Sequence, residues 1–96
     1  MTAQLRIYDI EEGKLEEFAR LVSDHVIPPR LQYGFEIVGT WTIPANNQYC
    51  WIVSYEGPLS WEEAVERYYN SPERRNIAFD PDEFITKADL RQLEPI

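Results

Sequence analysis

The sequence contains one cysteine and one histidine in 96 residues. Cys50 cannot form a disulfide within the chain, which favours a reducing compartment. One histidine and one cysteine also do not make a ligand cluster, so we predict no metal site. The sequence has no nucleophile elbow, phosphate loop or dinucleotide fingerprint, and we therefore expect no cofactor.

Positive charge is scarce as well. Nine Lys and Arg residues stand against 17 Asp and Glu residues, which gives a formal net charge of −8. This charge opposes phosphate groups, so we expect neither nucleic acid nor an anionic membrane as a partner. No charged segment followed by an apolar one, the pattern of a signal peptide, precedes Leu5. We therefore expect a soluble, cytoplasmic protein. The length suits one domain over residues 1–96.

Residues 37–55 form the longest uncharged segment of the chain. The segment is long enough for a membrane span, but Pro44, Asn46, Asn47 and Gln48 lie in its middle, where polar groups would be costly in lipid. The flanking residues are rich in β-branched and aromatic side chains. The segment therefore predicts a hairpin of strands 35–43 and 49–55 joined by a turn.

The remaining elements follow from changes in apolar period. Residues 4–10 alternate and predict a strand, whereas the stripe Leu15, Phe18, Val22 and Val26 predicts a helix from residue 14. Prolines at 28 and 29 should stop or kink this helix near residue 26, with a last turn running on to residue 33 before Gly34.

A second helix is predicted after Ser60, which forms a capping box with Glu63. Ser71 and Pro72 predict a further short turn over residues 72–77. Residues 84–93 alternate weakly and predict a fourth strand.

The order strand, helix, strand, strand, helix, strand predicts an α+β, ferredoxin-like fold: a four-stranded antiparallel sheet with two helices on one face. Right-handed crossovers place the first and third strands in the middle. We assign compact side chains to the helix face, namely Leu5, Ile7, Cys50 and Ile52. We assign the larger aromatic and cationic side chains to the open face, namely Arg6, Tyr8, Trp41, Trp51 and Tyr55. A single bulge would reverse the faces of the second strand.

The open face predicts a second copy. Four strands leave roughly 400 Å² uncovered, and stacking two such faces about a twofold axis would enclose a barrel-like interior. We therefore predict a homodimer of the dimeric α+β barrel type. The alternative is a monomer in which this face of the sheet is exposed to solvent.

Several short segments carry a family resemblance. The most specific are Leu5, Arg6 and Tyr8 followed by Gly13, Leu15, Glu17 and Phe18, and the Trp51 to Tyr55 strand. Further similarity lies in residues 25–29, 33–35, 39–41 and 69–74. From its start to about position 80, the chain resembles the NIPSNAP family of dimeric α+β barrel proteins. The resemblance implies the fold and the dimer. The wider superfamily includes cofactor-free monooxygenases, haem-degrading enzymes, aldoxime dehydratases and stress-response proteins, and fold analogy does not choose among them.

His25 is the candidate catalytic residue. Histidine as a residue type changes its charge near neutral pH, so His25 could act as a general base or as an axial ligand to haem iron. A histidine near a helix C-terminus also interacts favourably with the helix dipole without any catalytic duty.

Candidate ligand-binding residues combine aromatic walls with cationic groups, which suits a flat or weakly acidic organic molecule. They are Arg6, Tyr8, Trp41, Trp51, Tyr55 and Tyr69. The last of these, with Arg30, Tyr33 and Tyr68, could form a pocket mouth between helices and sheet. The same aromatic and Arg residues could instead form the dimer interface.

The leading hypothesis is a protein that binds a small organic molecule in its cavity, with a monooxygenase-like or isomerase-like activity in which His25 moves a proton. A noncatalytic dimerisation or interaction protein is the first alternative. A haem-binding protein using His25 is the second.

Overall fold

The uncharged segment forms the predicted hairpin. Strand β2 (Phe35–Ile43) pairs antiparallel with β3 (Gln48–Tyr55), and the short 3-10 helix η2 (Pro44–Asn46) connects them. Asn47 closes the turn with a left-handed backbone (φ 53°), and its side-chain amide donates a 2.6 Å hydrogen bond to the carbonyl of Ile10. This bond fixes the tip of the hairpin to the first strand.

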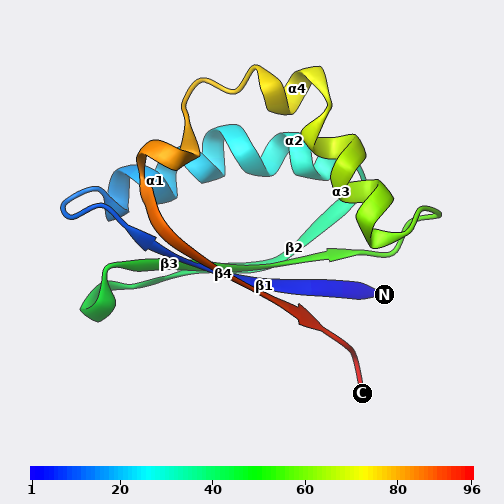
Figure 1. Ribbon diagram of the computed structural model, residues 1–96, viewed down its shortest axis with the longest axis horizontal. Helices are drawn as coiled ribbons and strands as arrows, with labels where there is room; N and C mark the ends of the chain where they lie inside the picture. The colour runs from blue at the N-terminus through cyan, green and yellow to red at the C-terminus, as the bar shows by residue number, and fades with distance from the viewer.

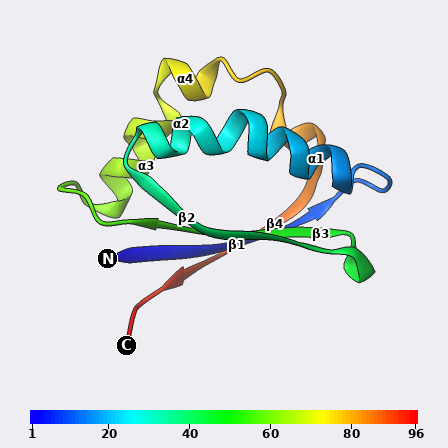
Figure 2. The ribbon, with the colours of Figure 1, turned by 180° about the vertical axis from the view of Figure 1, so that it is seen from behind.

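The sheet has the predicted topology. In the computed structural model, which describes residues 1–96, β1 (Thr2–Ile10) pairs antiparallel with both β3 and β4 (Ile85–Leu93). The strand order is β2-β3-β1-β4, so the first and third strands are central. The α-helices all lie on one face, and Figures 1 and 2 show the opposite face bare. The ferredoxin-like α+β fold is confirmed.

The first helical segment is continuous over its whole predicted length. Helix α1 (Leu15–Leu21), the π-helical segment η1 (Val22–Val26) and α2 (Ile27–Gln32) follow one another without a break and form one rod over the sheet (Figure 1). Of the two outcomes predicted near residue 26, a stop or a kink, the stop does not occur, and the helical segment ends near residue 33 as predicted. The wider turn of η1 carries a bond from the Ile27 N–H to the Val22 carbonyl, and Pro28 and Pro29 then lie in the first turn of α2, where proline is tolerated.

The second helical layer follows its predicted caps. Ser60 Oγ accepts a 3.1 Å hydrogen bond from the Glu63 N–H at the start of α3 (Trp61–Tyr69). Ser71 caps α4 (Pro72–Arg75), which lies above α2 on the side away from the sheet (Figure 2). A final 3-10 turn, η3 (Pro81–Glu83), leads into β4. No helix combines the length and the apolar character needed to cross a bilayer.

The predicted sheet faces are reversed in the two central strands. Tyr8 and Trp51 are 5% and 2% exposed and pack under the helices, together with Tyr55 and the Arg6 head group. The compact residues occupy the bare face instead: Leu5, Ile7, Cys50 and Ile52. The large aromatic side chains bury more area than the compact ones, and here they fill the space between the sheet and the helical layer.

The second strand changes face at a bulge. The register with β3 shifts between Ile37 and Gly39, so Val38 has no partner. Ile37 therefore faces the helices, while Trp41 lies opposite Cys50 on the bare face and is 49% exposed. The Trp41 ring covers Gly39, where a Cβ atom would lie 2.5 Å from the ring. Placement of Trp41 on the bare face was predicted correctly.

Candidate functional site: a cationic cavity under the helices

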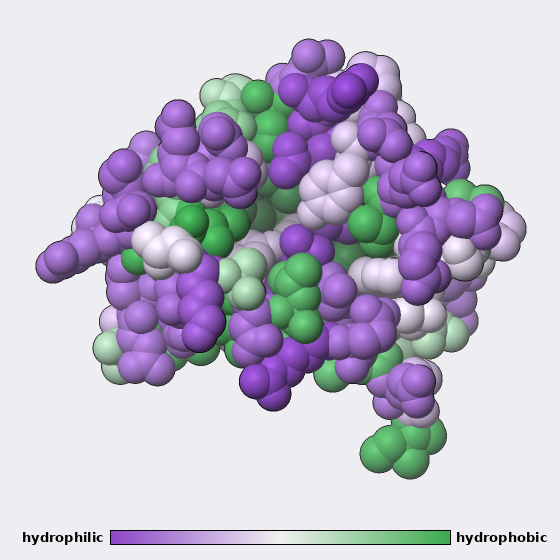
Figure 3. All heavy atoms as spheres, viewed as in Figure 1, coloured by the Kyte–Doolittle hydropathy of each residue, from purple (hydrophilic) through white to green (hydrophobic).

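A cavity of about 300 Å³ lies between the sheet and the helices. Figure 3, which shows the same side of the molecule as Figure 1, shows the hollow near its centre. The cavity is therefore under the helices of one chain, not inside the predicted barrel interior between two sheets. Its apolar end is formed by Phe18, Val22, Val26, Pro81, Ile85 and Ala88.

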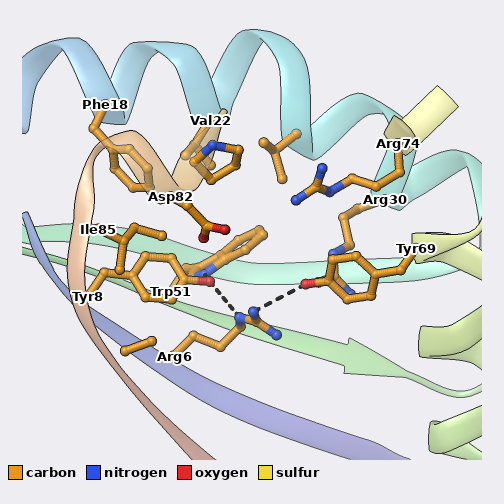
Figure 4. Close-up of a pocket in the computed structure, with 13 residues that line it drawn as sticks. Arg6, Tyr8, Phe18, Val22, Arg30, Trp51, Tyr69, Arg74, Asp82 and Ile85 are labelled. Atoms are coloured by element: carbon orange, nitrogen blue, oxygen red, sulfur yellow. Dashed lines mark hydrogen bonds between the residues drawn. The ribbon is translucent and has the colours of Figure 1, made fainter. Parts of the chain in front are cut away.

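Arg6 forms the floor of the polar end. Alternation along β1 directs Arg6 and Tyr8 to the same side, and Arg6 Nε donates a 2.6 Å hydrogen bond to the Tyr8 hydroxyl. Arg6 Nη2 donates to the Tyr69 hydroxyl at 3.3 Å (Figure 4). Arg6 Nη1 donates to Gln4 Oε1 at 2.9 Å. One guanidinium therefore joins the two tyrosine hydroxyls across the cavity.

Arg30 contributes a second, more deeply buried guanidinium. It lies in the last turn of α2 and is 1% exposed. Its Nη2 donates to the Tyr69 hydroxyl at 3.1 Å, whereas Nε and Nη1 have no hydrogen-bond partner. Aromatic rings surround its head group, at 4.3 Å for Tyr68 and 4.8 Å for Phe35. These contacts stabilise the cation but supply no acceptor.

No carboxylate neutralises these groups. The only ion pair in the structure joins Arg91 and Asp89, neither of which lines the cavity. Arg74 adds a third guanidinium from α4, and Asp82 is the single carboxylate that lines the cavity. A chain with net charge −8 therefore contains a cationic pocket.

The surroundings change the pKa values of Arg6, Arg30 and Tyr69. Burial lowers the pKa of Arg30. Burial would also lower the pKa of Arg6, but the Tyr8 and Tyr69 hydroxyls outweigh it and raise that pKa. For Tyr69, burial favours the neutral phenol, yet the Arg guanidiniums around it outweigh burial and lower its pKa.

Trp51 completes the polar end. Its indole Nε1 donates to the Tyr8 hydroxyl at 3.2 Å, so this oxygen accepts bonds from both Arg6 and Trp51. Arg74 lies over the Tyr69 ring, with its guanidinium carbon 5.2 Å from the ring centroid. Figure 4 shows the two tyrosine hydroxyls pointing toward one another above Arg6.

Four of the six candidate ligand-binding residues line the cavity: Arg6, Tyr8, Trp51 and Tyr69. Trp41 lies on the other side of the sheet, and Tyr55 is buried against Phe35, where its hydroxyl accepts a bond from the Leu59 N–H. His25 is half-buried beside Phe79, with ring centroids 6.1 Å apart, and does not line the cavity. No three His, Cys, Asp or Glu side chains gather as a potential metal site.

Two polar lining residues were not predicted, Arg74 and Asp82. Local signals place both on short turns, after the Ser71 cap and within the Asp80-Pro81-Asp82 loop. No sequence signal within these turns shows that they lie over the cavity. Their position depends on the path that the chain takes from α3 to β4. Arg30 was predicted at a pocket mouth, whereas it lies at the buried end.

Comparison with known proteins places the chain in a family. A protein-family model described as NIPSNAP matches residues 3–96. No curated protein matches the sequence significantly.

Solved structures share the whole fold. An uncharacterized NIPSNAP domain protein from Burkholderia xenovorans is 24% identical, with 100% of this chain and 95% of that chain covered and a TM-score of 0.82. A NIPSNAP family protein from Agrobacterium tumefaciens is 21% identical, with 99% and 92% covered and a TM-score of 0.82. A protein from Lactobacillus acidophilus, provisionally named a monooxygenase, is 19% identical, with 97% of this chain but 43% of that chain covered and a TM-score of 0.75. At these identities, the similarity shows the fold alone.

Proposed function

This chain belongs to the NIPSNAP family, and we propose that its cavity binds a small organic molecule that carries an acidic group. The observation that carries this proposal is the Arg30 guanidinium, which is 1% exposed and has two nitrogens without a hydrogen-bond partner.

A buried charge without a partner is unfavourable for the folded chain. Burial of an ion costs several kcal/mol unless an opposite charge or hydrogen bonds compensate it. Ring contacts return only part of this cost. A ligand carboxylate could accept two parallel bonds from a guanidinium fork, which is the strongest hydrogen-bonding arrangement available to Arg.

The opposite end of the cavity fits an apolar body. Phe18 is 0% exposed and Val22 is 2% exposed, so a hydrocarbon or aromatic group there would leave water completely. A volume of about 300 Å³ is at the small end of ligand sites, which favours a compact acid over a nucleotide or a lipid.

The test compares acids with neutral analogues of the same shape. Isothermal titration calorimetry would measure binding of benzoate and phenylacetate beside benzamide and phenylacetamide. We expect the acids to bind at least about tenfold more tightly, because hydrogen bonds to a charged group contribute about 1.5–3 kcal/mol.

A matched pair of variants locates the site. Arg30→Met should weaken acid binding at least about tenfold, whereas Arg20→Met, on the exposed side of α1, should leave it unchanged. Equal affinity for acids and amides, or full acid binding by Arg30→Met, would contradict the proposal.

We also propose that the bare sheet face receives a second copy of this chain. Leu5, Ile7 and Ile52 have no helix over them, and Trp41 is 49% exposed. Four strands of eight or nine residues present roughly 550 Å² in projection. Two such faces would bury roughly 1,100 Å², which exceeds the approximately 1,000 Å² expected of a biological interface. A twofold stack is self-complementary and closed.

A further inference from the structure

We propose that Tyr69 is a catalytic residue whose hydroxyl exchanges a proton with a carbon atom of the bound acid, and that the substrates are acids with an enolisable carbonyl group. This inference deepens the proposed function and depends on it. The reaction class is an isomerisation by proton transfer next to a carbonyl.

The hydrogen bonds of Tyr69 leave its proton free for a ligand. The hydroxyl oxygen accepts bonds from Arg30 Nη2 at 3.1 Å and from Arg6 Nη2 at 3.3 Å. Both donors are cations, and no protein acceptor takes the hydroxyl proton. A phenol that already accepts two charged bonds can donate only in another direction. Since Tyr69 lines the cavity, that direction is open to a ligand.

The charges that face Tyr69 favour its ionised form. Arg6 approaches from β1, Arg30 from α2 and Arg74 from α4. The neighbouring Tyr68 ring on α3 and the Tyr8 hydroxyl on β1 are uncharged. Asp82 on η3 is the one negative side chain that lines the cavity. With cations predominating, the pKa of Tyr69 is lowered, although burial acts in the opposite direction.

Tyr8 supplies a second hydroxyl for the same ligand. Its oxygen accepts bonds from Arg6 Nε and Trp51 Nε1, so its proton also has no acceptor in the chain. Figure 4 shows Tyr8 and Tyr69 on opposite sides of Arg6 with their hydroxyls converging. A carbonyl oxygen between them would receive a bond from Tyr8 while Tyr69 reaches the adjacent carbon.

The proton transfer balances without a co-reactant. The ionised Tyr69 oxygen takes a proton from the carbon next to the ligand carbonyl, and the C–H electron pair becomes the carbon–carbon double bond. The carbonyl π pair moves to oxygen, and the resulting enolate accepts a hydrogen bond from Tyr8. Return of the proton from Tyr69 to the enolate oxygen or to carbon completes the tautomerisation and restores the ionised side chain.

The first experiment needs no ligand. Ultraviolet absorbance would follow phenolate formation in the ligand-free chain as pH is raised. We expect one tyrosine to ionise below the others, and this step should be absent from Tyr69→Phe. Arg6→Gln, which keeps Tyr69 but removes one facing cation, should move the step to higher pH.

The second experiment measures the chemistry with phenylpyruvate, which combines a carboxylate, an aromatic body and an enolisable carbonyl. NMR in heavy water would follow exchange of its CH₂ protons for deuterium. We expect Tyr69→Phe to lose at least about 100-fold of the catalysed rate. Tyr33→Phe is the matched control, because the Tyr33 hydroxyl donates to Glu73 at 2.7 Å outside the cavity lining.

The outcomes separate the two proposals. Calorimetric binding of phenylpyruvate by Tyr69→Phe, together with lost exchange, supports both. Failure of the wild-type chain to bind any acid would overturn the proposed function. The phenolate titration would still show whether the Tyr69 phenol ionises at a lower pH than the other tyrosines. Unchanged exchange in a folded Tyr69→Phe chain, or a low-pH phenolate step that persists in that variant, would overturn the catalytic role. Circular dichroism would verify the fold, and Arg6→Gln gives an independent test of the titration.

Discussion

Arg30 Nη2 lies 3.1 Å from the Tyr69 hydroxyl oxygen, and this contact joins the last turn of α2 to the last residue of α3 at one end of the cavity. The bond links two helices that are far apart in sequence. It leaves Arg30 Nε and Nη1 buried without partners, so the contact does not explain why a cation is there.

The first prediction separates a ligand-binding role of Arg30 from a structural one. Arg30→Met should leave the free energy of unfolding within about 1 kcal/mol of the wild-type value, because a flexible apolar side chain replaces a buried cation. The lost ring contacts oppose this gain by a similar amount. Urea denaturation would measure the change.

Phe18→Ala provides the comparison for that measurement. Phe18 is fully buried in the same region and packs only through apolar contacts, so its truncation should cost about 3–5 kcal/mol. A loss of similar size in Arg30→Met would show that Arg30 is held for stability.

The second prediction concerns the two serine caps. Ser71 Oγ accepts from the Arg74 N–H at 3.2 Å and donates to the Tyr68 carbonyl at 2.5 Å, and the residue is 4% exposed. Ser71→Ala should therefore cost about 1–2 kcal/mol and also weaken acid binding, since α4 carries Arg74 to the cavity.

Ser60→Ala is the matched control for Ser71→Ala. Ser60 caps α3 through the Glu63 N–H at the exposed end of that helix, so its loss should cost about 1 kcal/mol. Acid affinity should not change. If calorimetry finds the same affinity in both variants, α4 does not help to form the site.

Short sequence patterns predicted the helices, strands and turns well, because a few neighbouring residues determine each of them. The Ser60 cap, the left-handed exit at Gly34 (φ +90°) and the turn after Ile43 each depend on a few neighbouring residues. The extent of the first helical segment to about residue 33 was predicted, but whether it stops or bends near residue 26 was left open for the same reason. Two prolines are a local stop signal, but a π-helical segment before them accommodates both.

Local sequence patterns do not determine which side of the sheet faces the helices. Alternation correctly grouped Arg6 with Tyr8 and Trp51 with Tyr55, but it does not say which group faces the helices. Aromatic and cationic residues with unpaired polar tips suggest an open face, whereas here they surround a cavity. The bulge at Val38 also moved Trp41 to the other side from Ile37, and no single residue type marks it.

The third prediction is a loss of stability in alkaline solution that depends on Tyr49. This residue is 3% exposed, and burial, with the Tyr8 hydroxyl as a smaller cause, raises the pKa of its phenol. The unfolded chain then loses this proton first, near pH 10, so the stabilising contribution is complete below that pH and falls above it. Tyr68 contributes in the same direction, because burial raises its pKa.

Denaturant titrations at several pH values would measure this dependence. Tyr49→Phe cannot ionise, so its free energy of unfolding should fall less steeply above about pH 10 than that of the wild-type chain. Parallel curves for the two proteins would show that Tyr49 ionises equally easily in the folded state.

The fourth prediction concerns the second copy on the bare sheet face. Ile52→Asp would place a charge at the centre of that face, and a buried unpaired carboxylate in each copy should abolish the dimer. Light scattering after size exclusion should give twice the chain mass of 11.4 kDa for the wild-type protein and the single chain mass for the variant. Leu31→Asp is the control. Leu31 is 52% exposed on the helical layer, so this substitution should leave the dimer intact.

Gly39→Ala is a milder test of the same face. A methyl group at this position must displace the Trp41 ring, and the substitution should weaken association without unfolding the chain. A wild-type mass of 11.4 kDa at micromolar concentration would show that the face remains open to solvent.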